Sequence, residues 1–253
     1  MSLDYNFYLA AIPIVLMVGM AKGGFGGGLA MLAVPLMALM IDPRIAAAIL
    51  LPILCCMDIV GLLKFKGKWD NDNLKALIPG ALLGTLIGAI SFSYTNADII
   101  RLMLGLLSLY FVAYFLWGQR RLTSLSKKEN NKIAGVFWGI ISGFASYIAH
   151  AGGPPIAIHL IPQKLEKSTF ASTTIIFFAL INFVKLIPYI ALGQINFSTI
   201  ESSLYLLPLA PMGVLLGIYL HHKVSEALFY KLTCIFLLMA GSKLTYEGLT
   251  ALL

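Results

Sequence analysis

The chain has 253 residues, of which 59% are hydrophobic and only 11% are charged. This composition lies far outside the range of soluble domains and predicts a protein embedded in a lipid bilayer. The formal charge of +7 does not indicate nucleic-acid binding, because most basic residues fall in short connections between apolar segments, as in cytoplasmic loops.

The first predicted element is a helical hairpin, residues 5–21 and 28–40, which is broken by the glycine-rich run from Lys22 to Gly28. Each glycine weakens a continuous helix by about 1 kcal/mol. Non-helical backbone at membrane depth is tolerated only where it is buried in protein or lines a cavity. We therefore expect the run to contribute to a binding site, with these candidate residues: Lys22, Gly24, Phe25, Gly26, Gly27 and Gly28.

Apolar segments long enough to span about 30 Å of hydrocarbon follow this hairpin. Three are predicted at residues 44–63, 74–92 and 98–117, before a polar, basic connector at 119–132. A second hairpin, residues 133–149 and 152–161, is broken at His150-Ala151-Gly152-Gly153-Pro154-Pro155. Three more spans are predicted after it, at residues 171–192, 199–220 and 227–246.

The order of elements suggests one duplicated unit. Gly27-Gly28 matches Gly152-Gly153, Asp58 matches Asn182, and Pro79 matches Pro208, at offsets between 124 and 129 residues. An offset this constant is typical of an internal repeat. The predicted organisation is a first membrane repeat at 1–118, a cytoplasmic linker at 119–132 and a second membrane repeat at 133–253.

Each repeat makes an odd net number of crossings, because a hairpin returns the chain to its starting side. Placing the basic loops inside puts the amino terminus outside and the connector in the cytoplasm. The predicted fold class is an all-α integral membrane protein with two inverted repeats, each a glycine-broken helical hairpin plus three full transmembrane helices. The small-residue runs Gly80-x-x-x-Gly84-x-x-x-Gly88 and Gly135-x-x-x-Gly139-x-x-x-Gly143 predict close helix packing.

The two glycine-rich breaks favour an anionic ligand. A helix that begins after such a loop presents unpaired backbone N–H groups and a partial positive charge. Lys22 lies beside the first break and His150 beside the second. Their side chains would add hydrogen-bond donors that also favour an anion. The predicted substrate-binding residues of the second break are Tyr147, His150, Gly152, Gly153 and Pro154. The Tyr147 hydroxyl either lines the cavity or bonds to a helix carbonyl.

Ionisable residues within predicted spans form a second group of candidates, because each costs about 3 kcal/mol to insert. Asp58 lies inside a span, and its repeat mate Asn182 lies one helical turn from Lys185. Two interpretations of Asp58 are open. It either pairs with Lys22 or Lys185 to neutralise charge, or it binds a coupling ion or proton.

The residues of the two breaks, together with Pro35, resemble those of the TauE/SafE family of sulfite and organosulfonate exporters, and the likeness covers nearly the whole chain. The resemblance implies a multi-pass carrier in a bacterial or archaeal plasma membrane that needs no cofactor. Its expected partners are lipid and a small sulfur-containing anion such as sulfite or sulfoacetate. We also expect coupling to protons or sodium and transport by alternating access, in the direction of export.

Two other functions are open. An anion channel would share every one of these sequence features. An intramembrane enzyme would need a nucleophile and base or a metal cluster, whereas the chain has no H-E-x-x-H or G-x-S-x-G motif and its four histidines are scattered. We therefore expect no enzymatic activity and no metal site.

Overall fold

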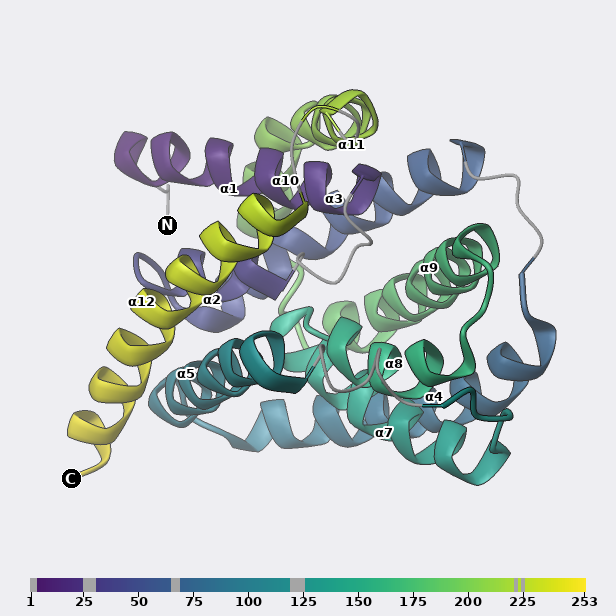
Figure 1. Cartoon of the computed structure of the whole chain (residues 1–253). Helices are drawn as coiled ribbons and strands as arrows, with labels where there is room; N and C mark the ends of the chain where they lie inside the picture. The colour runs from purple at the N-terminus through teal and green to yellow at the C-terminus, as the bar shows by residue number, and fades with distance from the viewer. Residues whose placement is uncertain (1–3, 25–30, 65–68, 119–125, 221–222, 224–225) are drawn as a thin grey trace.

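The structure is a computed structural model that describes residues 4–24, 31–64, 69–118, 126–220, 223 and 226–253 (Figure 1). Within these residues the chain is helical and contains no strand. The elements follow one another in this order: α1 (Tyr5–Gly24), α2 (Ala33–Ala38), α3 (Pro43–Lys64), α4 (Asn71–Tyr94), α5 (Ala97–Ala113), the π-helical turn η2 (Tyr114–Gly118), α7 (Lys132–Ala149), α8 (Gly153–Leu160), the 3-10 turn η3 (Ile161–Gln163), α9 (Lys167–Ala191), α10 (Phe197–Leu206), α11 (Leu209–Leu220) and α12 (Glu226–Leu252).

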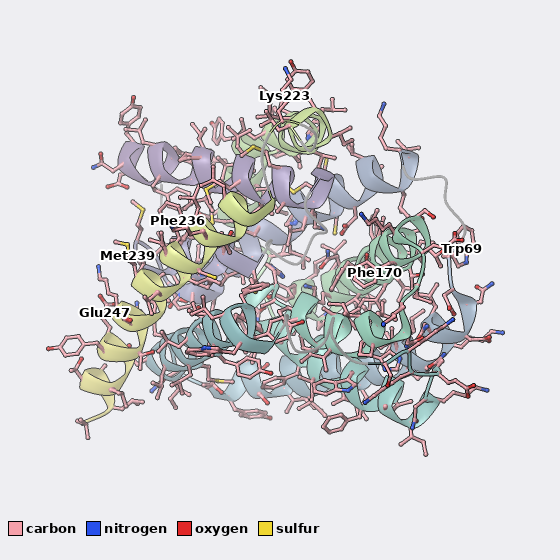
Figure 2. All side chains as sticks on the ribbon, viewed as in Figure 1. Trp69, Phe170, Lys223, Phe236, Met239 and Glu247 are labelled. Carbon is pink, nitrogen blue, oxygen red and sulfur yellow. The ribbon has the colours of Figure 1, made fainter. Side chains whose placement is uncertain are left out.

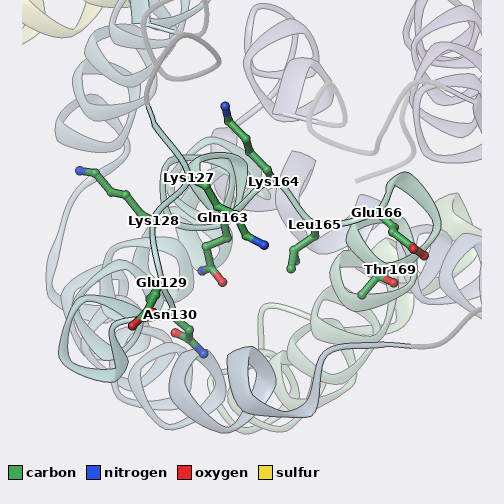
Figure 3. Close-up of a pocket in the computed structure, with 9 residues that line it drawn as sticks. All are labelled: Lys127, Lys128, Glu129, Asn130, Gln163, Lys164, Leu165, Glu166 and Thr169. Atoms are coloured by element: carbon green, nitrogen blue, oxygen red, sulfur yellow. The ribbon is translucent and has the colours of Figure 1, made fainter.

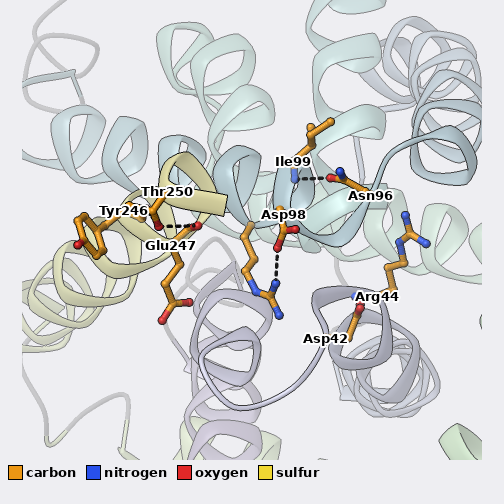
Figure 4. A network of polar contacts seen from close by, with 9 residues as sticks. Asp42, Arg44, Asn96, Asp98, Ile99, Tyr246, Glu247 and Thr250 are labelled. Atoms are coloured by element: carbon orange, nitrogen blue, oxygen red, sulfur yellow. Dashed lines mark hydrogen bonds and ion pairs between the residues drawn. The ribbon is translucent and has the colours of Figure 1, made fainter. Parts of the chain in front are cut away.

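Polar side chains fix where several helices begin. Each accepts a hydrogen bond from a backbone N–H in the first turn, which satisfies a donor that the helix itself leaves unpaired. The capping residues are Asp70, Asn96, Asn131 and Asn196. Figure 4 shows one of them, in which Asn96 Oδ1 accepts from Ile99 N at 2.8 Å. Asp98 in the same first turn forms an ion pair of 2.7 Å with Arg101.

Seven helical segments of the described chain are long and apolar enough to cross a membrane: 5–23, 43–64, 71–94, 97–117, 132–149, 167–191 and 197–220. They include five of the six predicted spans and confirm an all-α, multi-pass membrane protein. The remaining prediction, 227–246, lies within the 27-residue helix α12, which is not one of the seven. The segment 197–220 is two helices, α10 and α11, because Pro208 between them lacks the N–H of a continuous helix.

Large apolar side chains cover the outer surfaces of the helices. On α12, Met239 is 66% exposed and Phe236 is 38% exposed (Figure 2). On α4, Leu86 and Ile90 are each more than half exposed. Apolar exposure on this scale would make a soluble protein aggregate, whereas it suits contact with lipid.

The helices pack in a reciprocal pattern. The first helix of each half packs against the fourth segment of the other, so that α1 lies beside α11 and α7 lies beside α4 (Figure 1). The last helices of the two halves, α5 and α12, pack against each other, as do α3 and α9. Exchanging the halves leaves these pairs unchanged, which is the arrangement that a two-fold axis between two repeats would produce.

Glycines allow the tightest of these contacts. A Cβ added at Gly84 would lie 2.0 Å from the carbonyl oxygen of Ile140, and one added at Gly143 would lie 2.1 Å from that of Ala81. The prediction that the two glycine runs serve close packing is therefore confirmed, between α4 and α7. The α1 and α11 contact repeats the arrangement, since a Cβ at Gly217 would lie 2.4 Å from the Met20 carbonyl oxygen.

Candidate functional site

The first glycine-rich break begins at the end of α1. Lys22 lies in the last turn of this helix, which ends at Gly24. Four predicted site residues lie outside the described part of the chain: Phe25, Gly26, Gly27 and Gly28. The return helix is shorter than the predicted segment 28–40, because α2 comprises only Ala33–Ala38. It is buried along most of its length, so it lies within the protein rather than against lipid.

The second break is described in full. The helix α7 ends at Ala149, and His150 adopts a left-handed conformation with φ 51° and ψ 31°. Gly152 follows, and a Cβ there would lie 2.6 Å from Ser142 Oγ, so only glycine fits. The Ser142 hydroxyl donates to the Gly152 carbonyl oxygen at 2.8 Å. Gly153 then begins α8, with Pro154 buried in its first turn, where a missing N–H costs nothing.

An acidic centre joins three helices near the first break. The Lys22 ammonium at the end of α1 forms an ion pair with Asp58 Oδ1 on α3. Asn182 Nδ2 on α9 donates to the other carboxylate oxygen, Asp58 Oδ2, at 2.6 Å. The Asp58 side chain is 4% exposed. The contact with Lys22 is the one that the charge-pairing interpretation of Asp58 expects. A coupling role stays a prediction.

A basic centre lies one turn further along α9. Lys185 is completely buried, and its Nζ donates to the Ser146 carbonyl oxygen at 2.9 Å and to Ser146 Oγ at 3.0 Å. A third bond, of 2.8 Å, joins Lys185 Nζ to His150 Nδ1. An ammonium group has three protons to donate, so these bonds use its full capacity.

The contacts of His150 assign its tautomer. His150 Nε2 lies 2.9 Å from the carbonyl oxygen of Ala47 on α3. A carbonyl oxygen only accepts, so Nε2 carries a proton and donates. With Lys185 as an ammonium, its Nζ donates to Nδ1, which then carries no proton. The imidazole is thus neutral, and it connects the break before α8 to helices α3 and α9.

Aromatic side chains surround the basic centre. Tyr147 is completely buried, its carbonyl oxygen accepts from Tyr189 OH at 2.7 Å, and its hydroxyl donates to Gln194 Oε1 at 3.4 Å. The Tyr189 ring stacks on the His150 ring, with centroids 6.3 Å apart. Sequence reasoning identified Tyr147 but missed Tyr189, Gln194 and the Ala47 carbonyl, which lack any local pattern that would mark them.

The two centres bring together the polar side chains of the predicted site. Lys22, Asp58, Asn182, Lys185 and His150 come from both halves of the chain and meet where α1 and α7 end. With a neutral His150, the group carries two positive charges, on its lysines, and one negative charge, on its aspartate. Among the residues that the structure describes, no carboxylate forms an ion pair with Lys185. Because an uncompensated buried cation is costly, the arrangement attracts an anion.

The described residues contain no cluster of three or more His, Cys, Asp or Glu side chains placed to hold a metal ion. The three cysteines, Cys55, Cys56 and Cys234, are free thiols.

Comparison with known proteins agrees with this chemistry. A family model described as Sulfite exporter TauE/SafE matches residues 11–244, which is most of the chain and includes both breaks and both centres. Comparison with curated proteins and with solved structures gives no match. On the strength of the family match, together with its apolar helices and buried polar centre, the chain belongs to the TauE/SafE family of sulfite exporters, a family of membrane transporters.

Proposed function

We propose that the protein is a secondary carrier that exports small sulfur-containing anions, such as sulfite or sulfoacetate, from the cytoplasm across the plasma membrane of a bacterium or archaeon. The observation that carries the proposal is the buried excess of positive charge, in which Lys22 and Lys185 face a single carboxylate, that of Asp58. The family supplies the class of substrate, and the charge balance supplies an independent reason for an anion.

Binding at the basic centre would be an exchange of acceptors. All three donors of Lys185 are directed at protein acceptors, namely the two oxygens of Ser146 and the imidazole of His150. An oxyanion of sulfur presents several charged oxygens and forms stronger bonds to an ammonium than neutral acceptors do. It would displace His150 or Ser146 from Lys185, while Asp58 keeps Lys22 in place.

The two breaks suggest how the site could open to either side. Reciprocal packing of α1 with α11 and of α7 with α4 supports two repeats, 1–118 and 133–253, joined by the connector 119–132. In our proposal they have inverted orientations, with the amino terminus outside and the connector in the cytoplasm. Two such repeats can rock between mirror-related states around one central site, as in other secondary transporters. Coupling to protons or sodium, with Asp58 as the coupling group, completes the proposal.

The topology can be tested by labelling single cysteines with a membrane-impermeant maleimide in a variant without Cys55, Cys56 and Cys234. We expect a cysteine at Asp4 to react only from outside and one at Lys128 only from the cytoplasm. Reaction of both positions from the same side would contradict the inverted orientation and, with it, alternating access by paired repeats.

The transport activity can be tested by counterflow in proteoliposomes. A carrier that alternates between two states takes up labelled sulfite faster when unlabelled sulfite is present on the opposite side. An anion channel gives no such acceleration, and a protein of another specificity gives no sulfite uptake. Collapse of the proton and sodium gradients should slow net transport, and transport that is unaffected by both would contradict coupling.

A further inference from the structure

An open hollow lies on the surface of the protein where the described part of the connector ends. It has a volume of about 440 Å³ and lies between the end of the connector and the segment that follows α8 (Figure 3). Its lining comprises Lys127, Lys128, Glu129, Asn130, Gln163, Lys164, Leu165, Glu166 and Thr169. A backbone hydrogen bond of 2.9 Å, from Lys128 N to the Pro162 carbonyl oxygen, holds the two walls together.

The charges of the lining favour an anion. Three lysines face two glutamates, and no ion pair engages any of the three lysines within the described chain. Glu129 and Glu166 lie toward opposite ends of the group in Figure 3. The lining therefore has a formal excess of one positive charge, which raises the local concentration of small anions.

The backbone of Lys164 is unusual. Its φ is 51° and its ψ is 43°, in the left-handed region, where a side chain is disfavoured and glycine is the common residue. The only other residue besides glycine with positive φ in the described chain is His150. These two basic residues occupy the two ends of the segment formed by α8 and η3. Lys164 is the C-cap of η3, where a left-handed residue ends the helix and fixes the direction in which the chain leaves the wall of the hollow.

Gln163 connects the cavity to the interior. Its side chain lines the cavity and is also buried, with Nε2 donating to Asn73 Oδ1 at 2.9 Å and Oε1 accepting from Asn73 Nδ2 at 2.8 Å. His159 Nε2 donates to the same Asn73 oxygen at 2.9 Å. The cavity therefore lies against one end of α8, whose other end begins beside His150 and the basic centre. Its wall is made of amides that can exchange their mutual bonds for bonds to water or to an anion.

We infer that this cavity is a second anion-binding site, at which the transported anion docks before it passes along α8 to the basic centre. The inference rests on the proposed function and adds to it an entry site on the connector face. The ligand is a small oxyanion that accepts bonds from ammonium and amide donors. The phosphate of an acidic lipid headgroup has the same chemistry, so the test must separate the two sources.

The test measures sulfite transport in oriented proteoliposomes made of phosphatidylcholine alone, with sulfite applied at the connector face. The variant Lys164→Gly/Lys127→Ala removes two positive charges. Glycine adopts the left-handed conformation at position 164 without steric cost. We expect its KM to rise about tenfold, with kcat unchanged. The KM of the wild-type protein should also rise with ionic strength, and that dependence should be weaker in the variant. The matched control is Lys75→Ala/Lys132→Ala, which removes two exposed lysines outside the cavity and should leave KM unchanged.

Three outcomes would overturn the inference. If the wild-type protein transports sulfite and the variant has an unchanged KM, the entry site is wrong and the proposed function stands. If the wild-type protein carries no sulfite, the proposed function fails, and the entry site fails with it. If the effect appears only when phosphatidylglycerol is added to the vesicles, the cavity holds a lipid headgroup rather than the transported anion.

Discussion

Asp58 and Asn182 lie 124 residues apart in the chain and bond directly to each other at 2.6 Å; the sequence comparison predicts that they are matching positions of two repeats. If the halves are related by a two-fold axis, two matching residues can touch only at the axis itself. In that case the contact would place the acidic centre on the axis between the two predicted repeats. The halves differ at this point in charge, because one supplies a carboxylate and the other a neutral amide. This difference determines where Lys22 finds its partner.

Loss of the Asp58 carboxylate should destabilise the protein, and placing a carboxylate at position 182 instead should restore part of the loss. In Asp58→Asn the Lys22 ammonium, which is 11% exposed, has no counter-charge, so the free energy of unfolding should fall by about 3 kcal/mol. In the double variant Asp58→Asn/Asn182→Asp the carboxylate lies on α9, within the same cluster of lysines. We expect a recovery of about 1 kcal/mol or more, measured by thermal unfolding in detergent. A double variant less stable than both single variants would contradict a shared electrostatic centre.

Removal of the buried lysine Lys185 should weaken sulfite binding without lowering the stability of the fold. Lys185→Met keeps an apolar stem of similar length and deletes the charge. Sulfite binding should weaken by about 10-fold to 100-fold, because charge-assisted hydrogen bonds are worth about 1.5–3 kcal/mol. Stability should not fall, because replacing a buried charge with an apolar side chain is often neutral or stabilising. Calorimetry and thermal unfolding measure the two effects. Lys223→Ala, which removes an exposed lysine, is the control and should bind sulfite normally.

The left-handed conformation of His150 predicts an unusual order of stability among its variants. His150→Gly and His150→Ala lose the same imidazole bonds to Lys185 and Ala47. Only alanine retains a Cβ at φ 51°, which costs about 1–2 kcal/mol. His150→Gly should therefore be the more stable variant by about 1 kcal/mol, although glycine is usually the more destabilising substitution. Denaturant unfolding measures the difference, and an equal or reversed order would show that this turn carries no strain.

The sequence predicts the polar centre better than its surroundings. Lys22, Asp58, Asn182 and Lys185 can be identified because an ionisable or amide side chain within an apolar span is rare and costly. The break at His150 can be identified because glycine and proline interrupt a helix. These signals are local, and the structure confirms that the residues that carry them meet.

The surrounding contacts have no such signal. Asn73 and Gln163 form a buried amide pair, but they lie 90 residues apart and near span ends, where polar residues are ordinarily exposed. The acceptor for His150 Nε2 is the backbone carbonyl of Ala47, and any residue type supplies a carbonyl. Such contacts depend on how helices pack, which the pattern of one segment does not determine.

Glycine positions in the helix interfaces should differ sharply in their tolerance to alanine. A Cβ at Gly84 would lie 2.0 Å from the Ile140 carbonyl oxygen, which is backbone and cannot rotate away. Gly84→Ala must therefore push α4 and α7 apart, and we expect it to lower the free energy of unfolding by about 1–3 kcal/mol. Gly61→Ala is the matched control within a helix, because its Cβ would lie 3.6 Å from Ile175 Cγ2, at ordinary contact distance. It should be neutral or slightly stabilising, since alanine favours the helix. Thermal unfolding of both variants in detergent gives the comparison. Equal tolerance at the two positions would mean that α4 and α7 can separate at little cost, and that close packing through glycine does not hold the two halves together.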